Sequence, residues 1–249
     1  MATTVVGDIH GNRAGLVEVL EQFGPELGVG DWLIFVGDYI DRGPDSKGCV
    51  DAILDFRATT PASVACLLGN HEDWFRKTKA NHTNHAWLLG MDAWPTIESY
   101  SRDAAARLRR EAASAKAQLY EGTVALPYEL FFETVPRDHM TFFDDLTLYQ
   151  RTDDCLAVHA GVAAGHAALT DMSPRTLVWG WGDEGFPDAY AGNETVVYGH
   201  RNNAVLDERG WPWPKVIGRT VGVDSSRHGV VTAYRLPDAK TFQSHRHTI

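Results

Sequence analysis

Short apolar runs alternate with amphipathic stretches over the first third of the chain. The runs at residues 3–6, 32–36 and 63–68 are continuous and consist largely of apolar or β-branched residues, which is typical of buried strands. Residues 13–23 carry apolar side chains at helical spacing, and a second such stretch, containing Val50, Ile53 and Leu54, follows the second run. Three strand-loop-helix units in succession predict an α/β fold with a parallel sheet and helices on its faces.

The pattern changes between about residues 73 and 147, where helical periodicity dominates and residues 101–118 form the clearest helix. No linker rich in proline, glycine and serine bounds this segment, so we expect residues 73–147 to be a helical cap inserted within a single domain, residues 1–249. Strands are predicted again at 155–158, 195–198, 220–223 and 229–236. The polar tail from Gln243 to Ile249 is expected to fray.

Composition narrows the possible partners. The formal net charge of −10 argues against binding to nucleic acid or to an anionic membrane surface. A phosphorylated substrate remains compatible with this charge, because bound divalent cations would dominate the local potential. The chain has no apolar stretch long enough to cross a bilayer and no secretory leader, which favours a cytoplasmic protein. Cys49, Cys66 and Cys155 are too few and too widely spaced for a disulfide framework, so we expect them to be reduced core residues.

Polar side chains recur where the predicted strands end. A lone aspartate or histidine at such a position is usually a turn former or a satisfied core residue. Here the pattern recurs at five strand ends, and glycine is adjacent at four of them. Because ligands bind at the carboxyl ends of parallel strands, we expect these side chains to meet at one site. They are Asp8, His10, Asp38, Asn70, His71, His159 and His200.

The donor set indicates metal chemistry. Oxygen and imidazole ligands without a thiolate suit divalent ions such as Mn, Fe, Zn or Co. Six ligands are too many for one catalytic ion that must keep a position open, but they fit two ions roughly 3.5–4 Å apart that share a carboxylate. The sequence therefore predicts a two-ion centre formed by Asp8, His10, Asp38, Asn70, His159 and His200.

Five segments carry a family resemblance. They are Gly7-Asp8-Ile9-His10-Gly11, Gly37-Asp38-Tyr39-Ile40-Asp41-Arg42-Gly43, Gly69-Asn70-His71-Glu72, Val158-His159-Ala160-Gly161 and Gly199-His200. In this order they resemble the signature blocks of the calcineurin-like metallophosphoesterases, and the second block is similar to the phosphoprotein phosphatase branch of bacterial and phage type. The resemblance implies two mixed β-sheets packed together with helices outside.

The resemblance also implies a role for each matched residue. Asp8 and His10 would hold the first ion, Asp38 would bridge, and Asn70, His159 and His200 would hold the second. Manganese is the first expectation, with iron, zinc, cobalt and nickel as alternatives. His71 would protonate the leaving oxygen and Asp41 would orient His71. Arg42 would clamp the substrate phosphate, and Asn70 would also contact it.

The sequence departs from the family pattern at two places. Trp181 stands where a second phosphate-binding arginine is expected, and Arg201-Asn202 follows His200 in place of Thr-Pro. Arg175 and Arg201 are therefore candidates for the missing positive charge.

The expected function is two-metal hydrolysis of a phosphoester. Phosphoserine or phosphothreonine in a protein is the first substrate class, because the second and third blocks have the form of that branch. A symmetrical dinucleoside tetraphosphate hydrolase and a general phosphodiesterase are the alternatives. A non-catalytic scaffold is disfavoured, because every ligand position and His71 are filled. The sequence leaves the oligomeric state open.

Overall fold

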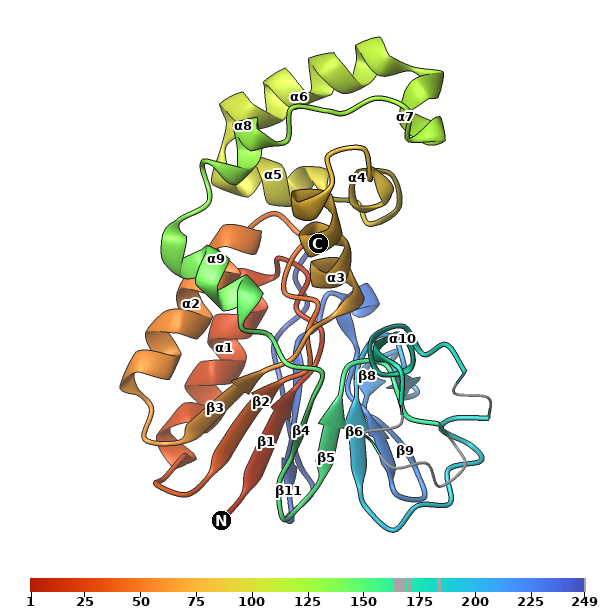
Figure 1. The fold of residues 1–249 in the computed structure, drawn as a ribbon. Coiled ribbons are helices and arrows are strands. Elements are labelled where there is room, and N and C mark those ends of the chain that lie inside the picture. Colours follow the sequence, from red (N-terminus) through yellow and green to blue (C-terminus); the bar gives the residue numbers. More distant parts are fainter. Residues whose placement is uncertain (164–168, 170–171, 183–184, 249) are drawn as a thin grey trace.

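The computed structural model describes residues 1–163, 169, 172–182 and 185–248, and two five-stranded sheets form its centre (Figure 1). The first sheet has the order β12-β11-β1-β2-β3, with β1 (Thr3–Val6), β2 (Trp32–Phe35), β3 (Ser63–Cys66), β11 (Thr232–Leu236) and β12 (Lys240–Gln243). The second has the order β4-β5-β6-β10-β9, with β4 (Tyr149–Arg151), β5 (Leu156–Val158), β6 (Val196–Tyr198), β9 (Lys215–Ile217) and β10 (Thr220–Gly222). A small hairpin pairs β7 (Val205–Leu206) with β8 (Pro212–Trp213).

Both sheets are mixed, as the family resemblance implied. β1, β2 and β3 are parallel, which the repeated strand-loop-helix pattern predicted. The first sheet is mixed because β11 pairs antiparallel with β1 and β12 pairs antiparallel with β11. In the second sheet β5, β6 and β10 are parallel, while β4 and β9 run antiparallel at its edges. A short connection permits only antiparallel pairing, which explains the added edge strands.

The strands alternate between two buried faces. Val5 packs between the sheets, whereas Val6 packs against the helices on the outside of the first sheet. In β6, Val197 lies between the sheets while Val196 and Tyr198 lie in a third cluster on the outer face. Because successive side chains point to opposite faces and both faces are covered, the runs are continuously apolar. This burial fixes the register of the strands and hence the positions of their carboxyl ends.

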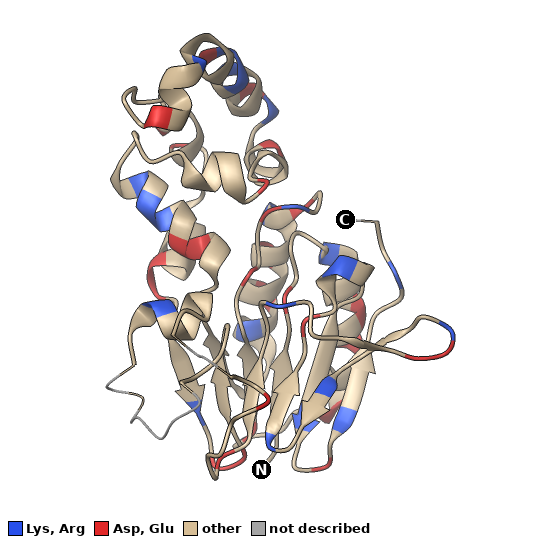
Figure 2. Cartoon of the chain, turned by 90° about the vertical axis from the view of Figure 1, so that its right-hand side faces the viewer, with Lys and Arg blue, Asp and Glu red and all other residues tan. Residues whose placement is uncertain are grey.

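Ten α-helices occur in the described part of the chain. Helices α1 and α2 flank the first sheet, and α9 packs against α2 and α3 (Figure 1). Helices α4 to α8 project beyond the carboxyl ends of the strands (Figure 1), and acidic and basic residues are interspersed along this projecting segment (Figure 2). The helix bounds are α1 (Arg13–Phe23), α2 (Ser46–Thr59), α3 (Asn70–Ala80), α4 (Ala86–Gly90), α5 (Trp94–Tyr100), α6 (Arg102–Ala115), α7 (Ala117–Glu121), α8 (Glu129–Phe132), α9 (Arg137–Asp144) and α10 (Pro174–Trp179). The limits of the inserted cap stay a prediction.

None of the helices formed by the described residues is long and apolar enough to span a membrane.

The C-terminal tail is ordered against the core, so the expectation that it frays was wrong for residues 243–248. Ser244 is buried, and its backbone N–H donates to the carbonyl of Val231 at 3.0 Å. The rings of His245 and His247 lie 3.0 and 2.9 Å from the two carboxylate oxygens of Glu18 on α1. The pairing of β12 directs the chain along α1, where these contacts hold it. Ile249 lies outside the described residues.

Candidate active site

The structure brings the predicted ligands together at the carboxyl ends of both sheets. Asp8 and His10 follow β1, Asp38 follows β2, and Asn70 follows β3 as the first residue of α3. His159 and His200 follow β5 and β6 of the second sheet. All six side chains are buried except that of His200, which is partly buried. The site therefore lies where the edges of the two sheets meet, as parallel strands require.

Glycines permit this close approach. A Cβ atom on Gly69 would lie 2.2 Å from Oδ1 of Asp38, and one on Gly199 would lie 2.0 Å from Oδ1 of Asp8. No side chain larger than hydrogen fits at either position without displacing a carboxylate. The glycines of these motifs therefore make room for the acidic groups.

The backbone of the site is strained. Five non-glycine residues of the site have backbone φ angles between 47° and 72°, in the left-handed region. Such conformations cost about 1 kcal/mol or more each and cluster at functional sites. The five are His10, Asp38, Asp41, Arg42 and His200.

Two histidines turn their lone pairs toward Asp38. Nδ1 of His10 lies 3.0 Å from the carbonyl of Ile40, and Nδ1 of His159 lies 2.9 Å from the carbonyl of Val36. A carbonyl only accepts, so Nδ1 carries the proton in both rings and Nε2 of the neutral ring is an acceptor. Each Nε2 is 3.4 Å from an oxygen of Asp38. A cation between such facing acceptors would be bound by all of them, so the residues fit a metal site.

Two groups of side chains could each hold an ion, and both contain Asp38. His10, Asp38 and His71 form one group, and Asp38, His159 and His200 form the other, with all ligand atoms of a group within 4.8 Å of one another. Asp8 adjoins the first group, because its Oδ2 is 4.0 Å from Nε2 of His10. A carboxylate common to two groups is the arrangement that a two-ion centre requires.

The Asn70 amide can complete the second group when its oxygen points inward, because only the oxygen of an amide binds a cation. With its oxygen inward, Oδ1 lies 3.0 Å from Nε2 of His159 and 2.9 Å from Nδ1 of His200, as suits an oxygen ligand of a cation. With its nitrogen inward, the amide donates to both rings and to Asp38. Rotation of this amide is therefore coupled to the charge at the centre of the site.

The electrostatics also favour a bound cation. Burial, together with the like charges of Asp224 and Asp38, raises the pKa of Asp8 well above its ordinary value. Burial lowers the pKa of His10 and His159, and burial with the neighbouring His159 lowers the pKa of His200 to about 3. The imidazoles are thus neutral ligands at pH 7, and a bound cation would offset the like-charge repulsion that raises the pKa of Asp8.

His71 and Asp41 form a buried dyad beside the ligand cluster. Nδ1 of His71 lies 2.7 Å from Oδ2 of Asp41, and its Nε2 faces the cluster 3.9 Å from Oδ2 of Asp38. Burial alone would lower the pKa of His71, but the carboxylates of Asp38 and Asp41 outweigh it and the pKa is raised. The dyad can therefore present a proton toward the centre of the cluster.

Arg42 reaches the same point from the opposite side. Its Nη1 lies 2.8 Å from Nε2 of His10, and its Nη2 lies 3.2 Å from Nε2 of His71. The Arg42 side chain is exposed, unlike the imidazoles that it contacts. Its guanidinium can therefore meet an anion that enters from solvent.

Comparison with known proteins gives the family. The sequence model of the calcineurin-like phosphoesterases matches residues 1–203. The chain belongs to the calcineurin-like phosphoesterase family. Serine/threonine-protein phosphatase 1 of Salmonella typhimurium is 37% identical over 94 residues, which are 37% of this chain and 39% of that protein. The chain thus matches well under half the length of this relative.

Two other relatives match this phosphoesterase over nearly its full length. The asymmetrical bis(5'-nucleosyl)-tetraphosphatase PrpE of Geobacillus sp. is 25% identical over 265 residues, covering 97% of this chain and 93% of that protein. A crystal structure of a protein provisionally assigned as a diadenosine tetraphosphatase superposes with a TM-score of 0.63 at 19% identity, covering 100% of this chain and 95% of the other. The latter likeness shows the fold alone.

The two candidate replacement arginines of the phosphoesterase lie around one loop. The Arg175 guanidinium lies 3.7 Å from the centroid of the Trp181 ring, so the arginine is stacked on the residue that departs from the family pattern. Nη2 of Arg201 donates to the carbonyl of Gly180 at 3.1 Å. Arg201 is near enough to His200 to contribute to the lowered pKa of that imidazole.

Several site residues of the phosphoesterase had no predicted role. Glu72 is buried, and its carboxylate accepts the backbone N–H groups of Asp38, Tyr39 and Ile40 at 2.9, 2.9 and 3.3 Å. It thereby holds the loop that carries Asp38. Asp224 contributes to the raised pKa of Asp8. It follows the apolar run of β10, so it lies at a strand end as the predicted ligands do. The same strand-end pattern could have found it.

The buried Asp41 also receives hydrogen bonds from the projecting helices. Nε1 of Trp87 on α4 donates to its Oδ2 at 2.9 Å, and Oγ1 of Thr96 on α5 donates to its Oδ1 at 2.6 Å. Nothing in the local sequence marks either partner. The helical segment thus takes part in fixing the dyad.

Proposed function

We propose that this phosphoesterase is a metal-dependent phosphomonoesterase that removes phosphate from phosphoserine or phosphothreonine in proteins. The observation that carries the proposal is the His71–Asp41 dyad, which directs a ring nitrogen into a cluster of acceptors that share Asp38. A proton donor beside a cation site provides both requirements of phosphoester hydrolysis, stabilisation of the phosphoryl charge and protonation of the leaving oxygen.

In this proposal Asp8, His10 and Asp38 hold one ion, and Asp38, Asn70, His159 and His200 hold the other. Manganese is the first candidate, since the ligands are oxygen and imidazole groups. Divalent ions bound there would polarise the phosphoryl oxygens and supply a nucleophile at neutral pH. Because His71 belongs to one of the two possible metal groups, it would lie beside the phosphorus of a bound ester, where a proton donor is needed.

The remaining steps belong to the chain itself. Arg42 clamps the non-reacting phosphate oxygens with its guanidinium and so orients the ester. His71 donates the proton at Nε2 to the leaving oxygen, which departs as a serine or threonine hydroxyl. Asp41 holds the proton on Nδ1 and the ring orientation throughout. Arg175 and Arg201 are proposed to supply further positive charge at the phosphate side.

A second candidate is hydrolysis of dinucleoside tetraphosphates. Its support is that the tetraphosphatase PrpE matches this chain over nearly its full length, whereas the protein phosphatase match is confined to about a third of it. The products separate the two functions. A protein phosphatase releases inorganic phosphate from phosphopeptides. A symmetrical tetraphosphatase gives two equal nucleotides from diadenosine tetraphosphate, and an asymmetrical one gives two unequal nucleotides.

A substrate panel tests the proposal. Phosphoserine peptide, nitrophenyl phosphate, diadenosine tetraphosphate and a cyclic nucleotide are each assayed with Mn, and products are resolved by chromatography. We expect phosphate release from the peptide with the highest kcat/KM of the four. A higher kcat/KM for the tetraphosphate would replace the first candidate by the second. No metal-dependent turnover of any member would leave only the scaffold.

A further inference from the structure

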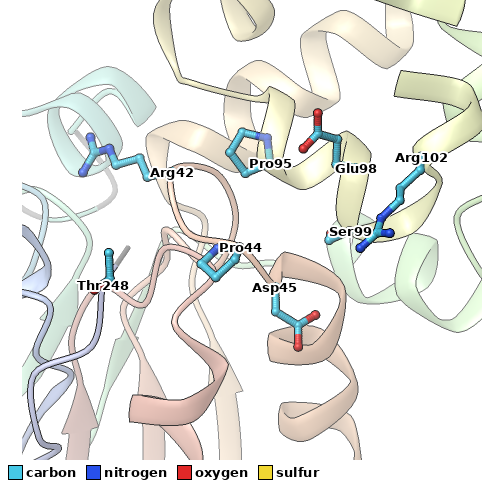
Figure 3. A pocket seen from close by; sticks show the side chains of 8 residues that line it. All are labelled: Arg42, Pro44, Asp45, Pro95, Glu98, Ser99, Arg102 and Thr248. Carbon is cyan, nitrogen blue, oxygen red and sulfur yellow. The ribbon is translucent and has the colours of Figure 1, made fainter. Parts of the chain in front are cut away.

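A cavity of about 740 Å³ lies between the loop after β2 and helices α5 and α6. Figure 3 shows Arg42 and Arg102 at opposite ends of the lining residues, with the rings of Pro44 and Pro95 between them. The tail residue Thr248 closes one side. The cavity is thus formed jointly by the core, the projecting helices and the ordered tail.

The cavity adjoins the candidate active site at Arg42. The Arg42 side chain lines the cavity, and its Nη2 lies 3.2 Å from Nε2 of His71. His71 is the proposed proton donor to the leaving oxygen. Figure 3 shows the Arg42 guanidinium pointing away from Pro95 and Arg102, so this side chain lies between the cavity and His71. A substrate group on the leaving-group side that passes Arg42 would reach the cavity.

The charges that line the cavity are not equivalent. Glu98 pairs with Arg109, and the Asp45 carboxylate lies 3.9 Å from Nε of Arg13 and accepts the N–H of Gly48 at 2.8 Å at the start of α2. Both acids are therefore engaged by groups that do not line the cavity. Arg102 is exposed at the first position of α6, and within the described part of the chain no acidic side chain forms an ion pair with it. The far end of the cavity consequently offers an uncompensated cation.

We propose that this cavity is a second substrate subsite, in which Arg102 selects phosphopeptides that carry an acidic side chain close to the phosphorylated residue. The inference rests on the proposed function, since it supplies the substrate class for the same site. The proline rings provide apolar walls for an extended peptide, and Arg102 provides the partner for a carboxylate. The recognised chemistry is an anionic group beyond the scissile bond, which diadenosine tetraphosphate also carries.

The test compares two charge reversals on one helix. Arg102→Glu acts at the cavity, and Arg110→Glu makes the same change at an exposed α6 residue that does not line it. Substrates are phosphoserine peptides flanked by glutamate, alanine or lysine, with diadenosine tetraphosphate as a separate arm. We expect R102E to lower the glutamate-to-alanine ratio of kcat/KM about fivefold to tenfold, mainly through KM, and to raise the lysine-to-alanine ratio. R110E should change each ratio less than about twofold.

Binding of a non-hydrolysable phosphonate analogue of the glutamate peptide, followed by calorimetry, gives a readout that does not require turnover. R102E should raise the Kd of this analogue about fivefold to tenfold. Equal effects of R102E on all three peptides, or equal effects of R102E and R110E, would overturn the subsite. A loss confined to diadenosine tetraphosphate would also overturn the peptide assignment. Failure of the unaltered protein to hydrolyse any phosphoester would instead count against the proposed function, and the calorimetry would still test Arg102.

Discussion

Replacement of Asp41 by asparagine should separate the proton donor from the rest of the site. The carboxylate is completely buried and accepts hydrogen bonds from His71 Nδ1, Trp87 Nε1 and Thr96 Oγ1 at 2.7, 2.9 and 2.6 Å. Asparagine keeps the shape but has one accepting oxygen. That oxygen will take the position shared by His71 and Trp87, because the indole N–H cannot become an acceptor, whereas the Thr96 hydroxyl can accept from the amide nitrogen.

The geometry therefore survives and the charge is lost. The charge-assisted bond to His71 weakens by about 1 kcal/mol, and removal of a buried charge partly offsets that loss. We expect the free energy of unfolding to change by less than about 1 kcal/mol. We expect kcat for a phosphoserine peptide to fall about 10²- to 10⁴-fold, since a general acid contributes on that order. For nitrophenyl phosphate, whose leaving oxygen scarcely needs a proton, the loss should be under about tenfold.

The assay measures steady-state kinetics on both esters for D41N, H71N and the double variant, with chemical denaturation of each. The double variant should be no slower than H71N, because Asp41 acts through His71. Thr96→Val is the control. It removes the bond to the other oxygen of Asp41, and with it the bonds of the same hydroxyl to the Asp41 N–H and to Ser46. It should lower stability by about 1–3 kcal/mol without changing the ratio between the two esters. Equal slowing of both esters by D41N, or multiplicative losses in the double variant, would refute the reasoning.

Three further predictions concern metal, thiols and the tail. Manganese at about 100 times its Kd should raise Tm by about 5–10 °C and a chelator should reverse the shift, whereas no shift with any divalent ion would contradict the metal centre. Cys49 and Cys155 are buried, and burial raises the pKa of both thiols, that of Cys155 to about 12, so at pH 8 a thiol reagent should modify these two only after unfolding, and fast reaction of either in the native protein would be contrary to this. Burial by itself would raise the pKa of Glu18, but hydrogen bonds from His245 outweigh it and the pKa is lowered from 4.5. The contribution of Glu18 is thus present above its unfolded pKa and is lost as pH falls through its folded pKa. Glu18→Gln should therefore speed hydrogen exchange of the His247 amide at pH 5.5, and unchanged exchange would show that Glu18 does not hold the tail.

Local patterns were sufficient to predict the strands that bear the site. Val5 and Val6 belong to a run that is apolar on both faces, and such runs end where ligands gather in a parallel sheet. The convergence of Asp8, Asp38 and His200 follows from that rule. The same rule would have reached Asp224, which we did not single out.

Other features depend on contacts that no local pattern encodes. Trp87 and Thr96 lie 46 and 55 residues after Asp41 in the sequence. They contact its carboxylate only because α4 and α5 project over the carboxyl edge of the sheets. The tail was mispredicted for a related reason. Its polar composition is typical of a frayed end, but β12 pairs with β11 and brings the imidazoles to Glu18. Long-range pairing decided both cases.

The left-handed backbone at five site residues has a bearing on how variants of this protein should be sought. Glycine adopts such angles freely, so its introduction at His10, Asp38, Asp41, Arg42 or His200 relaxes the main chain while it deletes a functional group. Heat-resistance screening of random libraries will then enrich inactive clones at these codons. A selection that scores turnover together with thermal survival is needed to retain the functional side chains while the thermal stability of the fold is increased.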